Sequence, residues 1–132
     1  MAARARRIAP RLRVTKPWLA KAMIFGGAAV VTSVFFINFC ALVYQCGCES
    51  LWAGAADSCN IHDAGSRHCP WCSIGTAGTG AVWAAIVGAQ AAVVFLWPGI
   101  AWLPRTLLAL LAFPLIGGIL AVGMGLAKGY WL

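Results

Sequence analysis

One short stretch of the chain, from Cys46 to Cys72, holds five of its six cysteines and both of its histidines. It reads CGCESLWAGAADSCNIHDAGSRHCPWC. Thiolate and imidazole groups are ligands of zinc and copper ions, and paired thiols also form and exchange disulfides. Three chemistries therefore compete for these residues: metal binding, disulfide cross-linking and thiol–disulfide exchange.

The ligand types occur in closely spaced sets, which favours metal binding. The sets are Cys46-Gly-Cys48, Cys59-Asn-Ile-His62 and His68-Cys69-Pro-Trp-Cys72. A spacer of two residues lets both ends of a tight turn face one ion, and a mixed Cys/His set suits zinc or copper. We therefore predict a zinc or copper site with the candidate ligands Cys46, Cys48, Cys59, His62, His68, Cys69 and Cys72.

The segment Cys69-Pro-Trp-Cys72 resembles the CPxC motif of glutaredoxin-like proteins and disulfide oxidoreductases. The resemblance implies an activated thiol at Cys69, with His68 as a cationic neighbour and Cys46/Cys48 as a second pair that passes electrons on. Among membrane proteins, the chain is similar to the disulfide-bond-forming and vitamin-K-epoxide-reductase-like families in having cysteine pairs beside membrane spans. Those families have more spans than the three expected here. A membrane oxidoreductase with Cys69 and Cys72 as its catalytic pair is thus an alternative to the metal protein.

Structural disulfides are the remaining use of the thiols. Two disulfides would fold the loop but leave the fifth loop cysteine unpaired. In this alternative the chain is an accessory subunit of a larger membrane complex, with a disulfide-stapled loop as a rigid cap.

Hydrolytic catalysis is not indicated by the charged residues. The only acids are Glu49, Asp57 and Asp63, and none has a second carboxylate at a useful spacing. No nucleophile, histidine and acid form a recognisable set. We therefore do not predict an enzyme of this kind.

The composition predicts that these groups are held by membrane helices. The chain is 62% apolar and 10% charged, with a mean hydropathy of +0.85, whereas soluble domains carry about 25% charged residues. Three apolar segments are long enough to cross a hydrocarbon core of about 30 Å. They cover residues 22–45, 81–103 and 106–127, and residues 46–80 form a loop between the first two.

Polar and small residues inside these segments predict contacts between helices. We expect Thr32, Ser33 and Asn38 to form hydrogen bonds to a neighbouring helix or back to the backbone, and Gln90 to form a helix–helix hydrogen bond. We expect Cys40 to be a small apolar filler. Stripes of glycine and alanine on the second and third segments favour close packing with other membrane subunits or with a second copy of the chain.

The basic residues predict the orientation of the chain. Seven of the ten lie between Arg4 and Lys21, so residues 1–21 are expected to be a cytoplasmic tail beside the first span, with lipid rather than nucleic acid as its partner. The loop is then exoplasmic. The sequence thus predicts an all-α integral membrane protein, expected in a bacterial inner membrane, with three transmembrane helices and a Cys/His-rich exoplasmic loop that binds zinc or copper.

Overall fold

The computed structural model describes residues 17–132 of the chain. Within this range the protein is helical and has no strand. Three long helices are joined by a loop that contains three short 3₁₀ turns. The elements are α1 (Pro17–Tyr44), η1 (Leu51–Ala53), η2 (Asn60–His62), η3 (Cys72–Ile74), α2 (Gly75–Leu96) and α3 (Trp102–Ala127).

All three long helices are long and apolar enough to cross a membrane. The shortest, α2, has 22 residues, which is about 33 Å of helix at 1.5 Å per residue. Most of their large apolar side chains are exposed on the outside of the bundle, as expected for surfaces that contact lipid. The predicted fold class, three apolar helices with a cysteine-rich loop between the first two, is confirmed.

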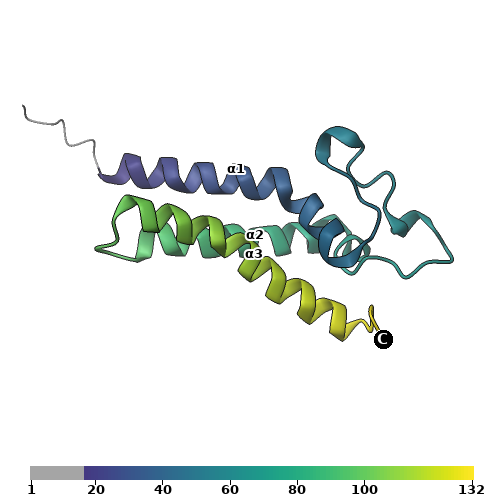
Figure 1. The fold of residues 1–132 in the computed structure, drawn as a ribbon. Helices are drawn as coiled ribbons and strands as arrows, with labels where there is room; N and C mark the ends of the chain where they lie inside the picture. Colours follow the sequence, from purple (N-terminus) through teal and green to yellow (C-terminus); the bar gives the residue numbers. More distant parts are fainter. Residues whose placement is uncertain (1–16) are drawn as a thin grey trace, which may run out of the picture.

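The helices lie side by side, and the loop that follows α1 covers one end of the bundle (Figure 1). The α2–α3 turn lies at the opposite end, so α3 returns the chain to the loop. The C-terminal residues therefore meet the end of α1, where Tyr130 donates a 2.7 Å hydrogen bond to the carbonyl of Tyr44. This topology brings three parts of the sequence together at the cysteine-rich end.

Two segments expected to be connections are helical. Residues 75–80, predicted as the last part of the loop, form the start of α2. Gly78 and Gly80 each cost the helix about 1 kcal/mol relative to alanine, whereas Gly75 begins it with φ of +72°, a conformation that favours glycine. The Thr79 hydroxyl lies 2.8 Å from the carbonyl oxygen of Trp71 and ties this first part of the helix to the loop. Residues 104 and 105, which lie between the predicted second and third segments, belong to the first turn of α3, where Pro104 has no intrahelical hydrogen bond to lose. Residues 1–16 of the predicted tail lie outside the described residues.

A polar contact near the middle of the bundle links all three helices. The buried Gln90 amide of α2 donates to the Thr32 hydroxyl of α1 at 2.8 Å and to the Ala109 carbonyl of α3 at 3.1 Å. The predicted interhelical role of Thr32 and Gln90 is confirmed. This contact fixes the register of the helices that carry the cysteine-rich end.

Candidate metal centre

The six cysteine sulfurs form one continuous cluster where the loop meets the helix ends. All six are free thiols. Successive Sγ atoms are 3.2 to 3.8 Å apart along the series Cys69, Cys40, Cys46, Cys48, Cys72 and Cys59. Five of the six are buried and Cys72 is partly buried. The fold therefore gathers residues from α1 and from both ends of the loop into a single sulfur-rich site.

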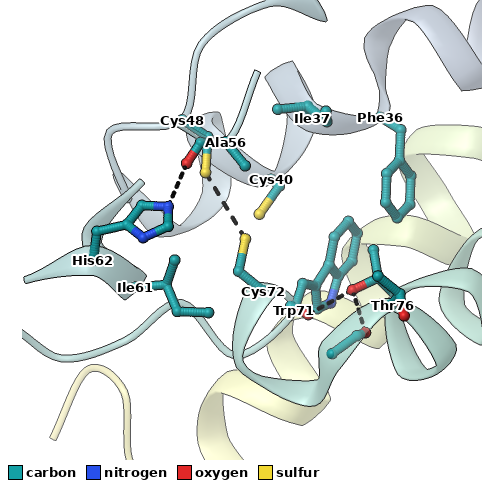
Figure 2. Close-up of a pocket in the computed structure, with 12 residues that line it drawn as sticks. Phe36, Ile37, Cys40, Cys48, Ala56, Ile61, His62, Trp71, Cys72 and Thr76 are labelled. Atoms are coloured by element: carbon teal, nitrogen blue, oxygen red, sulfur yellow. Dashed lines mark hydrogen bonds between the residues drawn. The ribbon is translucent and has the colours of Figure 1, made fainter. Parts of the chain in front are cut away.

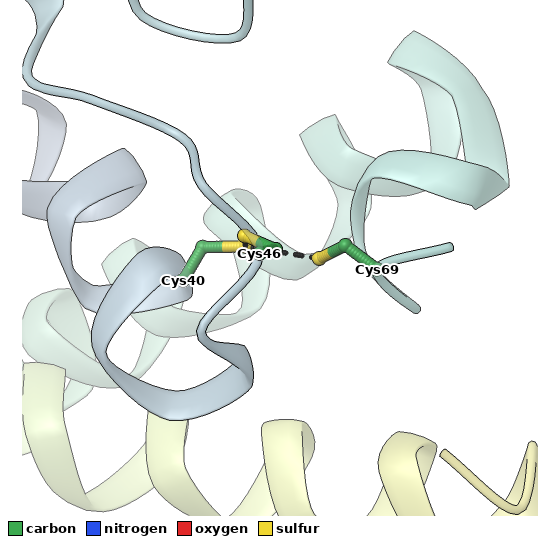
Figure 3. Close-up of side chains that lie close together, drawn as sticks. All are labelled: Cys40, Cys46 and Cys69. Atoms are coloured by element: carbon green, nitrogen blue, oxygen red, sulfur yellow. Dashed lines mark hydrogen bonds between the residues drawn. The ribbon is translucent and has the colours of Figure 1, made fainter. Parts of the chain in front are cut away.

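Two groups of three sulfurs within the cluster are compact enough to hold a metal ion. The first contains Cys40, Cys46 and Cys69 (Figure 3), and the second contains Cys46, Cys48 and Cys59; all Sγ atoms in each group lie within 4.8 Å of one another. A zinc–sulfur bond of about 2.3 Å places the sulfurs of a tetrahedral site about 3.8 Å apart. The observed contacts of 3.2 to 3.8 Å are close to this spacing.

The end of α1 directs the chain back toward the cluster. Cys40 lies on the same buried face as Tyr44, one turn before the helix ends. Gln45 follows with φ of +50° and donates its backbone N–H to the Ala41 carbonyl at 2.8 Å. A left-handed residue at this position is a common helix termination, and here it brings Cys46 to within 3.8 Å of Cys40.

Gly47 allows its two cysteine neighbours to face the same site. Its φ is +76°, a conformation that favours glycine. A Cβ atom at this position would lie 2.7 Å from the Ser58 carbonyl oxygen. The later part of the loop, which we call its second arm, therefore packs directly against Gly47, which belongs to the first arm. The resulting turn leaves the sulfurs of Cys46 and Cys48 3.3 Å apart.

Asn60 holds the two arms of the loop together. Its backbone N–H donates to the Cys46 carbonyl at 2.8 Å, and its side-chain oxygen accepts from the Cys69 N–H at 2.9 Å. Its amide nitrogen donates to the Arg67 carbonyl at 2.7 Å and to the Tyr130 hydroxyl at 3.3 Å. The backbone of Asn60 thus holds the Cys46 segment, and its side chain holds the Cys69 segment and connects it to the C-terminal residues.

Trp71 anchors the CPWC segment to the helices. The indole is 1% exposed and stacks on Phe36 with ring centroids 5.0 Å apart and an interplanar angle of 13°. It also meets the Tyr44 ring edge-on at 6.0 Å. Because Trp71 lies between Cys69 and Cys72 in the chain, its burial fixes both thiols against the bundle.

The C-terminal residues close one side of the site. Trp131 stacks on Tyr44 with centroids 5.6 Å apart, and the Tyr44 hydroxyl donates to the Ala121 carbonyl of α3 at 2.7 Å. Gly125 makes room for this arrangement, since a Cβ there would clash with the Trp131 ring. The aromatic residues therefore lock α1 and α3 together beside the cysteines.

The two histidines do not join the compact groups of sulfurs. Both are exposed and outside the two metal-sized groups. The Nε2 atom of His62 is 3.1 Å from the Ala56 carbonyl oxygen, and that of His68 is 3.2 Å from the Asp63 carbonyl oxygen. Of the seven predicted ligands, the structure thus brings the five cysteines together and leaves both histidines bonded to loop carbonyls.

A cavity of about 420 Å³ reaches the cluster from the side (Figure 2). Cys40, Cys48 and Cys72 contribute to its wall, and His62 also lines it. The rest of the lining is mostly apolar and includes Phe36. The cavity offers a route by which a small ion or ligand can reach the sulfurs.

Cys40 is the site residue that the sequence interpretation missed. We expected an apolar filler, because it lies inside the first apolar segment and six residues before the loop cysteines. Its Sγ is 3.2 Å from that of Cys69, the shortest sulfur contact in the cluster. Its position one turn before the helix end was the available signal.

The thiols polarise one another. Cys46 and Cys69 each have a pKa below the usual value for a cysteine. The largest cause is the contact of each with the Cys40 thiol, which favours the thiolate form. Burial raises the pKa of Cys48. The cluster is therefore able to combine thiolates with thiols that donate to them, and a bound cation would favour the thiolates further.

The fold and the site define a small helical membrane-type protein with a buried cluster of free thiols that could hold a metal ion. No family model, curated protein or solved structure matches the chain.

Proposed function

We propose that this protein binds a soft transition-metal ion, zinc or copper(I), in the thiol cluster, either to order the loop or to hold the ion for transfer. The convergence of all six cysteines carries the proposal. Their sulfurs are in mutual contact, are free, and form two groups whose size suits a metal ion. Sulfur-only ligation selects thiophilic ions over magnesium or calcium.

The loop also needs a source of order that apolar burial does not supply. Its exposed residues include both large apolar side chains of η1, Leu51 and Trp52. The buried part consists of Cys46, Cys48, Cys59 and Cys69 together with Pro70 and Trp71. Metal binding to small cysteine-rich folds contributes on the order of 10 kcal/mol to folding. A bound ion would therefore stabilise the arrangement seen here.

The oxidoreductase alternative is less well supported by the geometry. Cys69, the residue expected to attack a disulfide, is 0% exposed. The CPWC pair therefore lacks the exposed thiol that exchange with a protein substrate needs. A disulfide-stapled accessory subunit is also less well supported, because the cysteines are free.

The surroundings proposed for this site follow from the membrane helices and the sequence. We place the three helices in a lipid bilayer, with the N-terminus cytoplasmic and the loop exoplasmic in a bacterial inner membrane. Exposed apolar helix faces support lipid contact, and they leave room for a second copy or for other subunits.

Metal analysis of the purified protein, combined with thiol counting under native and denaturing conditions, tests the proposal. We expect bound zinc or copper with six reduced cysteines that become reactive only after denaturation or chelation. A metal-free protein with oxidised cysteine pairs, even after purification under reducing conditions and incubation with Zn²⁺ or Cu⁺, would contradict it.

A further inference from the structure

We propose that the cluster holds two metal ions that share the thiolate of Cys46. Cys46 is the common member of the two metal-sized sulfur groups. The proposal rests on the metal-binding function and adds the number of ions and the ligands of each.

The first position, called the three-sulfur position, is formed by Cys40, Cys46 and Cys69. Cys40 Sγ lies 3.2 Å from Cys69 Sγ and 3.8 Å from Cys46 Sγ. These residues come from α1, from the start of the loop and from its end. An ion here would join the helix to both arms of the loop.

The second position, called the four-sulfur position, is formed by Cys46, Cys48, Cys59 and Cys72. The first three belong to one metal-sized group. Cys72 Sγ is 3.8 Å from that of Cys48 and 3.5 Å from that of Cys59, so it is placed to complete a tetrahedral set.

Coordination number favours two ions over one. A single tetrahedral ion uses four sulfurs, so one ion in the four-sulfur position would leave Cys40 and Cys69 without a role. These two make the closest sulfur contact in the cluster and are 4% and 0% exposed. A shared Cys46 lets all six thiols act as ligands, and each thiol gives up its proton as it binds metal.

The two positions differ in chemical character. Four protein ligands close the coordination of a tetrahedral ion, as in structural zinc sites, whereas three leave one position open. Cys40 of the three-sulfur position lines the 420 Å³ cavity, as do Cys48 and Cys72 of the four-sulfur position, so the open coordination position, and not access alone, distinguishes the two. A further ligand, or an acceptor thiol of a metal-receiving partner, can therefore approach the ion at the three-sulfur position by this route.

A matched pair of variants separates the two positions. Cys40→Ala leaves the three-sulfur position with two ligands, and the double substitution Cys59→Ala/Cys72→Ala leaves the four-sulfur position with two. Ser58→Ala is the control, because Ser58 lies next to Cys59 in the chain but is exposed. Each full-length protein is loaded with Zn²⁺ alone or with Cu⁺ alone, and bound ions are counted by native mass spectrometry and elemental analysis.

With at least one of these ions, we expect two per chain in the wild type and in Ser58→Ala, and one per chain in each cysteine variant. The two-ion proposal would be overturned by a wild type that saturates at one ion per chain with Zn²⁺ and also with Cu⁺. It would also be overturned if Cys40→Ala and Cys59→Ala/Cys72→Ala both lost all metal while still folded by circular dichroism. One bound ion would leave the proposed function intact, whereas the absence of any bound ion would refute both.

Where a variant does not fold, the wild type still provides the test. Titration with Zn²⁺ or Cu⁺ should protect its thiols from alkylation in two stages, with peptide mapping showing that one stage protects Cys40 and the other Cys59. Protection of both cysteines in a single stage that ends at one ion per chain would contradict two positions.

Discussion

The inner and outer sides of the loop between α1 and α2 use similar metal-ligating residue types in opposite ways. On the inner side, against the helices, buried cysteines contact one another. On the outer side, His62 and His68 are exposed and bond to loop carbonyls. The comparison shows that the position of a side chain relative to the bundle, more than its spacing in the sequence, decides whether it can join the site.

Replacing Cys46 with alanine should have the largest effect, because this thiol belongs to both metal-sized groups. Loss of a group that hydrogen-bonds to a metal ligand lowers metal affinity by about 10–100-fold. Loss of Cys46, a ligand itself, should lower it by more. Competition with a chromogenic chelator measures the change. Equal affinity in Cys46→Ala and Ser58→Ala would show that the inner side is not the metal site.

Acidification should release metal from the inner side. Burial raises the pKa of Cys48, so this thiol keeps its proton to higher pH and must lose it when a metal binds. Protons therefore compete with the ion, and affinity rises with pH. We expect a loss of about tenfold per unit fall in pH for each proton released on binding. Affinity that is independent of pH across the neutral range would contradict thiol ligation.

Asn60 connects the two sides, and its removal should have an intermediate effect. In Asn60→Ala, the Cys69 N–H loses its acceptor and the side-chain bonds to Arg67 and Tyr130 are lost, while the backbone bond to Cys46 remains. We expect metal affinity to fall by about 10–100-fold, the range found for outer partners of metal ligands. Asn60→Asp is the matched variant, because it retains an acceptor for Cys69 and should lose less. Equal losses in the two variants would indicate that this hydrogen bond does not position the ligand.

The histidine variants should have the smallest effect on metal binding. His62→Ala and His68→Ala remove side chains outside both metal-sized groups. We therefore expect the number of bound ions to be unchanged. Metal affinity should change by less than about 10-fold, the smallest loss typical of groups that hydrogen-bond to a metal ligand. His62 lines the cavity, so its variant can alter the rate of metal uptake without altering the count. Stopped-flow uptake and elemental analysis measure the two quantities. Loss of one ion per chain in either variant would bring the outer side into the site.

The fold was predictable because long apolar segments leave few alternatives. The lengths of the three segments gave the helix number. The helical start of α2 was missed, because local glycine content argued against helix while contacts such as that between Thr79 and Trp71 favour it. Local propensity and tertiary packing disagree there, and packing prevails.

The site was predictable only in part, because its composition also depends on tertiary packing. The grouping of the loop cysteines could be anticipated from their spacing, but the inclusion of Cys40 depends on the turn at Gln45 that folds the loop back over α1. The spacing of Cys59 and His62 indicated a shared ion. In the structure, η2 occupies this interval and the His62 ring turns to the Ala56 carbonyl. Such choices depend on tertiary contacts that motif spacing does not contain.

X-ray absorption spectroscopy at the metal edge of the loaded full-length protein tests the central claim most directly, because it identifies the ligand atoms. A site built from the inner side predicts sulfur as the only protein ligand atom, at about 2.3 Å for zinc, and no imidazole. A shell containing imidazole nitrogen at about 2.0 Å would contradict this account and would assign the metal to the outer side of the loop.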